Sequence, residues 1–316
     1  MFNLLYEASK KTGLPTKKVL DFVYHLQQLG SIDTKSLIKL LGISKSSLVS
    51  LAQNLNTLIK TEGDLYTISP GTNINLSNHL VEEGLWPFLS DGKFLENAQK
   101  IEAINIGRRK ADRNFDQFYA TAETVAKRVS LMNFFADIAG KRILFLGDDD
   151  QTSVLTASYG NVKEIIAVDI DDGILSTIKQ NAPNVLTLQH DFKQPLPKEL
   201  TNGFDVVFTD PPYTQNGIRL FLSRAIEALD INNAAARIYM CYGNSDRAKE
   251  RYLPIYNIIL ETNLMIRWVL DKFNRYNGAE SIGSTSSLFI LDITPKIKPI
   301  VKGSFDSNIY TNETNS

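Results

Sequence analysis

From residue 141 onward, short aliphatic runs alternate with segments of helical periodicity, and this alternation constrains the fold more than any other feature. Strands joined by crossover helices form a parallel sheet, because each connection returns the chain to the same end of the sheet. The pattern therefore predicts an α/β domain over residues 141–295, with a doubly wound sheet. The expected strands are residues 142–146, 164–168, 185–189, 205–209, 237–242 and 287–293, with helices between them that include residues 217–229 and 245–260.

Residues 1–75 carry apolar positions at helical spacing in three blocks, with Ser44 placed to cap a helix, followed by a hairpin that turns at Gly63. This order predicts a winged helix-turn-helix domain. The segment holds eight lysines, no arginines and five acids, and the expected recognition helix over residues 44–58 carries only Lys45 as a cation. DNA readers gather basic side chains on that helix. A docking or dimerisation role is therefore favoured over contact with nucleic acid.

Residues 76–140 are expected to form a helical connector with a helix at 121–139, and residues 296–316, rich in Lys, Asn, Ser and Thr, a disordered tail. The 316 residues suffice for about two domains. The 34 basic and 35 acidic side chains produce no overall field that would attract nucleic acid or lipid. Cys241 is the only cysteine, and no secretory or membrane-spanning apolar run occurs. We expect a cytoplasmic protein with no membrane partner.

Acidic side chains follow four of the expected strands. Ligands of a doubly wound sheet bind beyond the carboxyl ends of its strands, so these positions are candidate site residues. The segment from Asp148 to Asp210 holds eleven acids and four lysines, a net charge of −7 in 63 residues. The side chains at the four strand ends are Asp148, Asp149 and Asp150, then Asp169, then Asp191, and finally Asp210.

Helix capping is an alternative explanation for part of this acidity, since Asp is favoured at helix starts. It accounts for Asp171 or Asp172 and for one member of the 148–150 run. It does not account for three consecutive aspartates, whose mutual repulsion destabilises the fold unless a cation offsets it. Asp169 stands where a nucleotide-binding domain places the acid that holds ribose hydroxyls. His190 is expected to be structural, and no metal site is inferred.

The turn after the first strand lacks the glycines that let backbone amides approach a pyrophosphate, and Gly147 is followed directly by aspartates. A dinucleotide cofactor is therefore disfavoured. The same acids would repel the carboxylate of S-adenosylmethionine. They favour its decarboxylated form, which keeps the positive charges and lacks the anion.

After the fourth strand comes the unit Asp210-Pro211-Pro212-Tyr213. Two prolines fix the backbone and remove two amide donors, which leaves the Asp210 carboxylate and nearby carbonyls as acceptors. An acceptor-rich turn suits a substrate amine, on which the Tyr213 ring can stack. A rigid proline turn with no function is the alternative.

These motifs resemble those of the branched-chain polyamine synthases, the N4-bis(aminopropyl)spermidine synthases. The resemblance implies a Rossmann-like, methyltransferase-type sheet behind an N-terminal winged helix. It also implies transfer of aminopropyl groups from decarboxylated S-adenosylmethionine to the internal amine of spermidine or a similar polyamine, by a homodimer without a prosthetic group. The resemblance covers residues 115–117, 121–128, 140–141, 147–150, 169–171, 190–191, 195–197, 204–205, 210–214, 221–224 and 273–276.

The resemblance also assigns roles. Asp150 would be the base that deprotonates the acceptor amine, with Asp210 and Tyr213 beside it in the catalytic group. The residues assigned to the polyamine are Asp148, Asp149, Pro211, Pro212, Asn274 and Tyr276. Those assigned to the nucleoside are Gln117, Gly147, Asp169 (ribose), Ile170 and Asp191 (adenine).

Two other functions stay open. An Asp-Pro-Pro-Tyr unit also marks methyltransferases that act on exocyclic amines of DNA or RNA, although the −7 segment would repel nucleic-acid phosphates. The second possibility is a polyamine-responsive regulator that binds DNA through its winged helix. It would bind duplex DNA tightly and release no methylthioadenosine.

Overall fold

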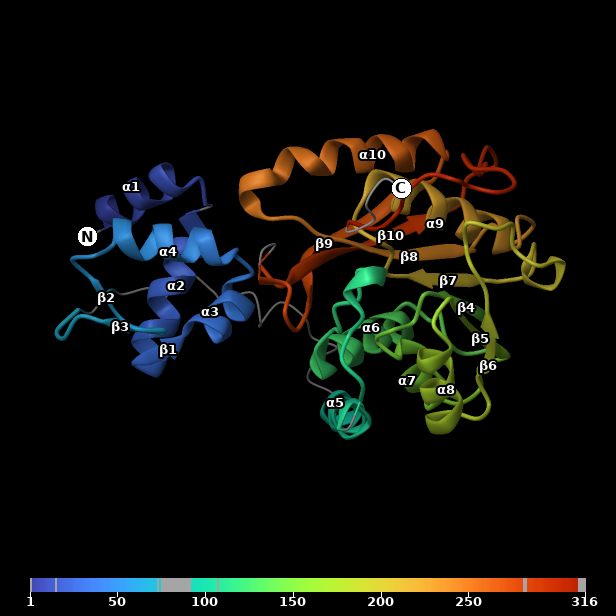
Figure 1. Ribbon diagram of the computed structural model, residues 1–316, viewed down its shortest axis with the longest axis horizontal. Coiled ribbons are helices and arrows are strands. Elements are labelled where there is room, and N and C mark those ends of the chain that lie inside the picture. Colours follow the sequence, from blue (N-terminus) through green and yellow to red (C-terminus); the bar gives the residue numbers. More distant parts are fainter. Residues whose placement is uncertain are drawn as a thin grey trace. The chain divides into compact units, whose positions relative to one another are not determined.

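The computed structural model describes residues 2–14, 16–72, 74, 92–106, 108–280 and 283–311. The chain divides into two compact units, each described here by itself (Figure 1). The first consists of Met1–Pro87, Gly243–Arg251 and Arg275–Thr285, and the second of Phe88–Tyr242, Tyr252–Asn274 and Ser286–Ser316. The expected continuous domain over 141–295 therefore differs from the structure, because two of its loops belong to the first unit.

The first unit is a group of short helices with a small antiparallel sheet of order β1-β3-β2. Ser44 caps a helix as expected, since its Oγ accepts from the N–H of Ser47, and Gly63 turns the hairpin with a φ of +60°. A side chain at Gly283 would collide with the backbone of Ile43, so only glycine fits there. The elements are α1 (Phe2–Thr12), α2 (Thr16–Leu29), β1 (Ser31–Asp33), α3 (Thr34–Leu41), α4 (Lys45–Asn54), β2 (Ile59–Glu62), β3 (Leu65–Ile68) and the 3-10 turn at Asp246–Arg251.

The second unit is built on a seven-stranded sheet of order β6-β5-β4-β7-β8-β10-β9. The first five strands in this order are parallel, and β10 runs antiparallel to β8. The chain proceeds outward from β4 to β6 and then returns to start β7 on the other side of β4. This reversal between β4 and β7 is the topological switch point, the place at which ligands of doubly wound sheets bind. The strands are β4 (Arg142–Leu146), β5 (Glu164–Asp169), β6 (Leu186–Gln189), β7 (Val206–Thr209), β8 (Arg237–Tyr242), β9 (Met265–Arg275) and β10 (Thr285–Asp292).

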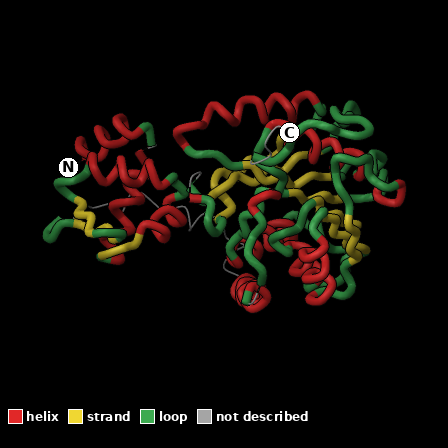
Figure 2. The backbone as a smooth tube through the Cα atoms, viewed as in Figure 1, coloured by secondary structure: helices red, strands yellow, loops and turns green. Residues whose placement is uncertain are grey.

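Helices cover both faces of this sheet, as Figures 1 and 2 show. On one face, α9 and α10 pack over a core that includes Val207, Ile238, Phe289 and Ile258. The other face carries α5 to α8. The helices are α5 (Gly92–Asn105), α6 (Ala122–Phe134), α7 (Thr152–Ala157), α8 (Asp172–Asn181), α9 (Gln215–Ala228) and α10 (Tyr252–Glu261), with 3-10 turns at Arg113–Phe115 and Lys198–Leu200. Within the described residues, no helix is long and apolar enough to cross a membrane.

The end of the chain corrects the expectation of a disordered tail, at least for residues 296–311. Val301 and Ile309 are buried, and the carbonyl of Ile309 accepts from Thr214 Oγ1 at 2.7 Å. The buried Arg224 of α9 donates to the carbonyl of Gly303 at 2.6 Å. The composition of this segment is polar and therefore indicated disorder. Its few apolar side chains and its backbone nevertheless pack along α9. Residues 312–316 lie outside the described part.

Candidate active site

The first two residues of the aspartate run leave β4 at the switch point, and they have different surroundings. Gly147 turns the chain there with a φ of +72°. Both carboxylate oxygens of Asp148 accept backbone N–H groups at the start of α7, from Thr152 at 2.8 Å and from Ser153 at 3.0 Å. Asp148 therefore caps the start of α7, and its assignment to a substrate ammonium group stays a prediction. Asp149 is half-buried and has no hydrogen bond or ion pair to any described residue.

Asp150 is almost fully buried and is held from two sides. Its Oδ1 accepts from the backbone N–H of Ala120 at 2.5 Å, and its Oδ2 accepts from Nη1 of Arg128 at 2.6 Å. Both of its carboxylate oxygens are therefore occupied by donors. The assignment of Asp150 as the base stays a prediction.

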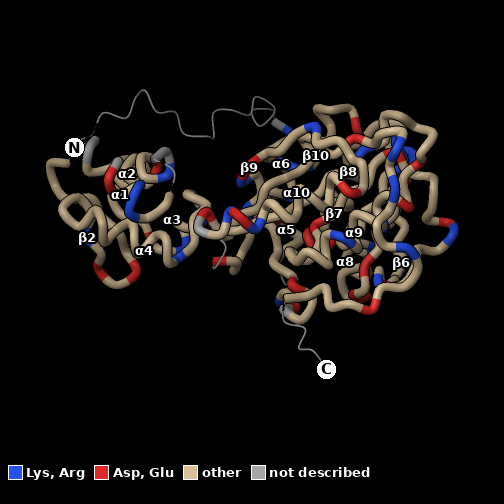
Figure 3. The backbone as a smooth tube through the Cα atoms, turned by 90° about the horizontal axis from the view of Figure 1, so that it is seen from above, with Lys and Arg blue, Asp and Glu red and all other residues tan. Residues whose placement is uncertain are grey.

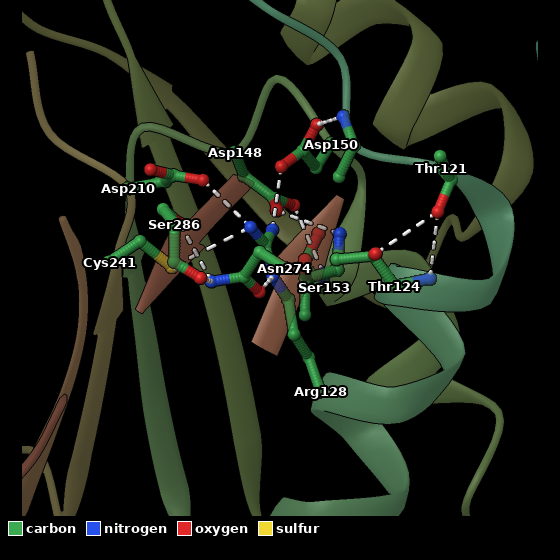
Figure 4. Close-up of polar contacts among 12 residues, drawn as sticks. Thr121, Thr124, Arg128, Asp148, Asp150, Ser153, Asp210, Cys241, Asn274 and Ser286 are labelled. Carbon is green, nitrogen blue, oxygen red and sulfur yellow. Dashed lines mark hydrogen bonds and ion pairs between the residues drawn. The ribbon is translucent and has the colours of Figure 1, made fainter. Parts of the chain in front are cut away.

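Arg128 of α6 is the residue that sequence reasoning missed, and Figure 4 shows it at the centre of the site. Its Nη2 donates to Oδ2 of Asp210 at 2.7 Å, so one guanidinium joins Asp150 and Asp210. Its Nε donates to Oδ1 of Asn274 at 2.9 Å. Asn274 is fully buried and holds this arginine, and its assignment to the polyamine pocket stays a prediction. A charged residue among the apolar positions of the expected helix at 121–139 was the available signal.

The Asp-Pro-Pro-Tyr turn follows β7 with Pro211 and Pro212 buried. The hydroxyl of Tyr213 donates to Oδ1 of Asp210 at 2.9 Å, so the tyrosine and Arg128 each hold one oxygen of this carboxylate. A side chain at Gly217 would come within 2.5 Å of the Pro212 carbonyl oxygen, so the start of α9 needs a glycine to approach the turn. The turn is therefore rigid, with Asp210 fixed in its orientation.

The acidic loop after β5 is also tied down. Oδ2 of Asp169 accepts from the N–H of Asp148 at 3.1 Å, and its Oδ1 accepts from the N–H of Asp171 at 2.9 Å. Asp171 caps α8, accepts from Nε2 of Gln117 at 3.1 Å and forms an ion pair with Arg109. Gln117 is thus linked to the loop that carries Asp169, and the roles of both residues in nucleoside binding stay predictions.

The remaining predicted positions have fewer contacts. Ile170 is half-buried, and its carbonyl accepts from Gln189 Nε2 at 3.0 Å. Asp191 is half-buried, and its Oδ1 accepts from the N–H of Lys193 at 2.9 Å. Tyr276 is buried in the first unit, where its N–H donates to the carbonyl of Ser284. The assigned roles of Ile170, Asp191 and Tyr276 stay predictions.

Burial sets the proton affinities of the acids. It raises the pKa of Asp148 to about 7 and that of Asp169 to about 6, against the hydrogen bonds that favour their charged forms. The pKa of Asp149 is also raised well above its ordinary value, first by burial and then by the charges of Asp150 and Asp210. Arg108 opposes that rise. Asp149 therefore combines a free carboxylate with a high proton affinity.

Basic side chains partly offset the negative charge of this region. Figure 3 shows Lys and Arg interspersed with Asp and Glu along the second unit. Arg128 compensates Asp150 and Asp210, and Arg109 compensates Asp171. The guanidinium of Arg108 lies 3.5 Å from the ring centroid of Tyr119. The net negative charge around these aspartates is thus smaller than the count of −7 over residues 148–210 implies. Among the described residues, no group of three or more His, Cys, Asp and Glu side chains is placed to hold a metal ion.

A cluster of buried polar atoms without partners lies just beyond the aspartates. Both side-chain polar atoms of Gln151 and the hydroxyls of Thr152 and Ser153 have no hydrogen-bond partner among the described residues. Gln151 also has a φ of +61°, which is unusual for a residue with a side chain. Buried polar groups are normally paired, so the Gln151 amide is an exception to that rule.

Comparison with known families agrees with these motifs. The model of the family described as Branched-chain polyamine synthase A C-terminal domain matches residues 96–314. An uncharacterized protein of Methanocaldococcus jannaschii is 40% identical over 225 residues, which are 70% of this chain and 56% of that protein. The N(4)-bis(aminopropyl)spermidine synthase of Thermococcus kodakarensis is 31% identical over 212 residues, 65% of this chain and 59% of that enzyme. The chain thus spans less than two thirds of the length of these relatives.

Solved structures show the same fold. The branched-chain polyamine synthase of Thermus thermophilus, solved in complex with N4-aminopropylspermidine and 5'-methylthioadenosine, aligns with a TM-score of 0.64 at 22% identity. The alignment covers 99% of this chain and 95% of that one. A putative RNA methyltransferase of Pyrococcus horikoshii aligns with a TM-score of 0.51 at 17% identity, over 64% of this chain and 98% of that one. The α/β fold with a methyltransferase-like sheet is therefore confirmed.

Proposed function

Because the chain belongs to the branched-chain polyamine synthase family, we propose that it transfers aminopropyl groups from decarboxylated S-adenosylmethionine to the internal secondary amine of spermidine or a similar polyamine. The products would be a branched polyamine and methylthioadenosine. The names of the relatives and the acid-rich switch point support this proposal.

The contacts of Asp148 are the observation that favours the decarboxylated donor. In this fold, N–H groups after the first strand are available to the carboxylate of a substrate amino acid. Here the Asp148 carboxylate already accepts the N–H groups of Thr152 and Ser153. A second carboxylate would find those donors occupied and a negative charge beside them. A nucleoside without a carboxylate avoids this repulsion, and its ammonium group is attracted.

The proposed reaction is a displacement at carbon. The acceptor nitrogen attacks the methylene next to the sulfonium, a C–N bond forms, the C–S bond breaks, and the electron pair stays on the sulfur of methylthioadenosine. The attacking amine must first lose a proton, because simple alkylamines have a pKa of about 10. We assign Asp149 as the base that accepts it, in place of Asp150, because Asp149 has no bonded partner and a raised pKa.

Fixed neighbours orient the reactants around that base. Asp210 and Tyr213, held together by their hydrogen bond, would bind the amine-bearing chain against the rigid turn at Pro211 and Pro212. On the other side of the switch point, Asp169 would hold the ribose. Gln117, Gly147, Ile170 and Asp191 would complete the nucleoside site.

Three further assignments rest on the resemblance and on the order of elements in the first unit. We propose that the first unit is a winged helix that serves docking, that the protein is a homodimer, and that it acts in the cytoplasm. Size-exclusion chromatography with light scattering tests the dimer. Electrophoretic titration with duplex DNA tests the first unit, and tight, salt-sensitive binding would contradict a docking role.

One incubation series tests the proposed function. Pure protein is mixed with decarboxylated S-adenosylmethionine or with S-adenosylmethionine, each with a panel of polyamines, and products are identified by mass spectrometry. We expect methylthioadenosine and a branched polyamine with the decarboxylated donor alone. Preference for S-adenosylmethionine, with methylated nucleic acid as the product, would replace the proposal by the methyltransferase alternative.

A further inference from the structure

Arg128 connects the two acidic motifs of the site, although they lie far apart in the sequence. Its side chain is 1% exposed, and its two terminal nitrogens donate to Asp150 after β4 and to Asp210 after β7, at 2.6 and 2.7 Å (Figure 4). These two strands flank the switch point. The guanidinium therefore fixes the distance between one carboxylate of each motif.

Further groups fix the guanidinium itself. Asn274 accepts from its Nε and donates to Oγ of Ser286 at 2.9 Å. The sulfur of Cys241 lies 3.5 Å from Nη2, and the ring of Phe208 lies 5.2 Å from Cζ. Strands β7, β8, β9 and β10 thus each carry a residue that helps to hold the Arg128 side chain in this orientation.

We propose that Arg128 is a positioning residue of the aminopropyl transfer: it holds Asp150 and Asp210, and with them the acidic loop that carries Asp149, in the arrangement that receives the acceptor amine. This inference rests on the proposed function. Arg128 does not contact the reacting atoms in this account. It acts through the two carboxylates that it joins.

The bridge also sets the local charge. Asp150 and Asp210 carry two negative charges, and the guanidinium offsets one of them at close range. Without it, the negative charges of Asp150 and Asp210, which raise the pKa of Asp149, would act on that residue without a bonded cation between them.

The geometry requires arginine and not only a positive charge. Two parallel donors on a planar fork can serve two separate carboxylates while Nε serves a third acceptor. A lysine ammonium is a single point charge on a flexible chain, so it can pair closely with only one of the two aspartates. Arg128→Lys therefore keeps the charge and removes the bridge.

A second buried arginine provides the matched control. Arg224 of α9 is 0% exposed and donates to the carbonyls of Phe192 and Gly303 and to Glu227. It is as deeply buried as Arg128 but contacts neither Asp150 nor Asp210. Arg224→Lys thus measures how much stability is lost when a buried guanidinium outside the site is replaced by an ammonium group.

The test compares wild type, Arg128→Lys and Arg224→Lys in kcat, KM, the pH profile of kcat and the thermal unfolding temperature. For Arg128→Lys we expect kcat to fall at least about tenfold, and the acid limb of the profile to move up by about one pH unit. For Arg224→Lys we expect a lower unfolding temperature, whereas kcat and the pH profile should equal those of the wild type.

Asn274→Ala is the second variant, in case Arg128→Lys fails to fold. It leaves all charges in place and removes the acceptor that orients Nε. We expect a several-fold lower kcat with an unmoved acid limb.

The outcomes separate the two proposals. If the wild type releases no methylthioadenosine with any polyamine, the proposed function fails and this inference fails with it. If the wild type turns over, and the folded Arg128→Lys protein matches it in kcat and in the acid limb, Arg128 is structural only. If Arg128→Lys does not fold, wild-type kinetics in Asn274→Ala overturn the inference in the same way.

Discussion

The backbone N–H of Asp148 donates to the carboxylate of Asp169 at 3.1 Å, so the ends of β4 and β5 are tied together through two acids. Both side chains are buried. Two carboxyl groups of raised pKa thus belong to neighbouring strand ends, which has a consequence for stability.

We predict that the free energy of unfolding falls as the pH rises from about 4 to about 7. The pKa of Asp169 is raised to about 6 and that of Asp148 to about 7, from an unfolded value of 3.8. Between these values the folded state binds more protons than the unfolded state, so raising the pH favours unfolding. Urea denaturation at intervals of pH measures the slope.

Two variants isolate this effect. Asp169→Asn should flatten the slope, because it removes one of the titrating groups. Asp306→Asn makes the same chemical change at an exposed position and serves as the control, with the slope expected to equal that of the wild type. An equal slope in all three proteins would show that Asp169 does not titrate in this window.

We predict that Asp149→Asn lowers kcat by about 10² to 10⁴-fold, the usual contribution of a general base. Its unfolding temperature should equal or exceed that of the wild type, since the replaced carboxylate has no bonded partner. Turnover is measured by methylthioadenosine release at saturating substrate. Activity close to that of the wild type would remove the assignment of Asp149.

Asp150→Asn provides the contrast. Loss of the charge opposite Arg128 should lower the free energy of unfolding by about 2 kcal/mol, a cost that Asp149→Asn does not carry. Equal destabilisation by both variants, measured by chemical denaturation, would contradict the different roles of these neighbours.

Gln151→Met should raise the free energy of unfolding by about 1 kcal/mol, because it replaces two buried polar atoms without partners by an apolar side chain of similar volume. Gln180→Met on the exposed side of α8 is the control and should change stability by less than about 0.5 kcal/mol. A clear loss of stability in Gln151→Met would mean that the amide is well paired.

Ile309→Ala should lower the free energy of unfolding by about 2 to 4 kcal/mol, since Ile309 is 2% exposed and packs on the core beside α9. Ile231→Ala, at a position 57% exposed, makes the same deletion without a cavity and should have little effect. If both variants behave alike in calorimetry, residues 296–311 do not contribute to the folded domain.

Most strands of the second unit could be predicted because buried parallel strands are continuous aliphatic runs. The range 142–146 matched β4, and 237–242 matched β8. Strand β9 was missed because it lies at the edge of the sheet and mixes Arg267, Asp271 and Lys272 with exposed apolar residues. Helix α5 was missed within a connector whose sequence carries a weak helical pattern.

The acids of the site could be predicted because each follows a strand, but their individual roles could not. Which aspartate caps a helix, which pairs with a cation and which stays free depends on side chains that are distant in sequence. Arg128 is separated from Asp210 by 82 positions and from Asn274 by 146. No local pattern indicates such a pairing.

The first unit takes two of its three segments from late in the chain, Gly243–Arg251 and Arg275–Thr285. On a translating ribosome, the N-terminal helices emerge long before these segments are synthesised. The unit can be completed only when Gly283 has left the exit tunnel and reached the backbone of Ile43. Its maturation therefore waits for nearly the whole chain, although its first residues are the first to be made.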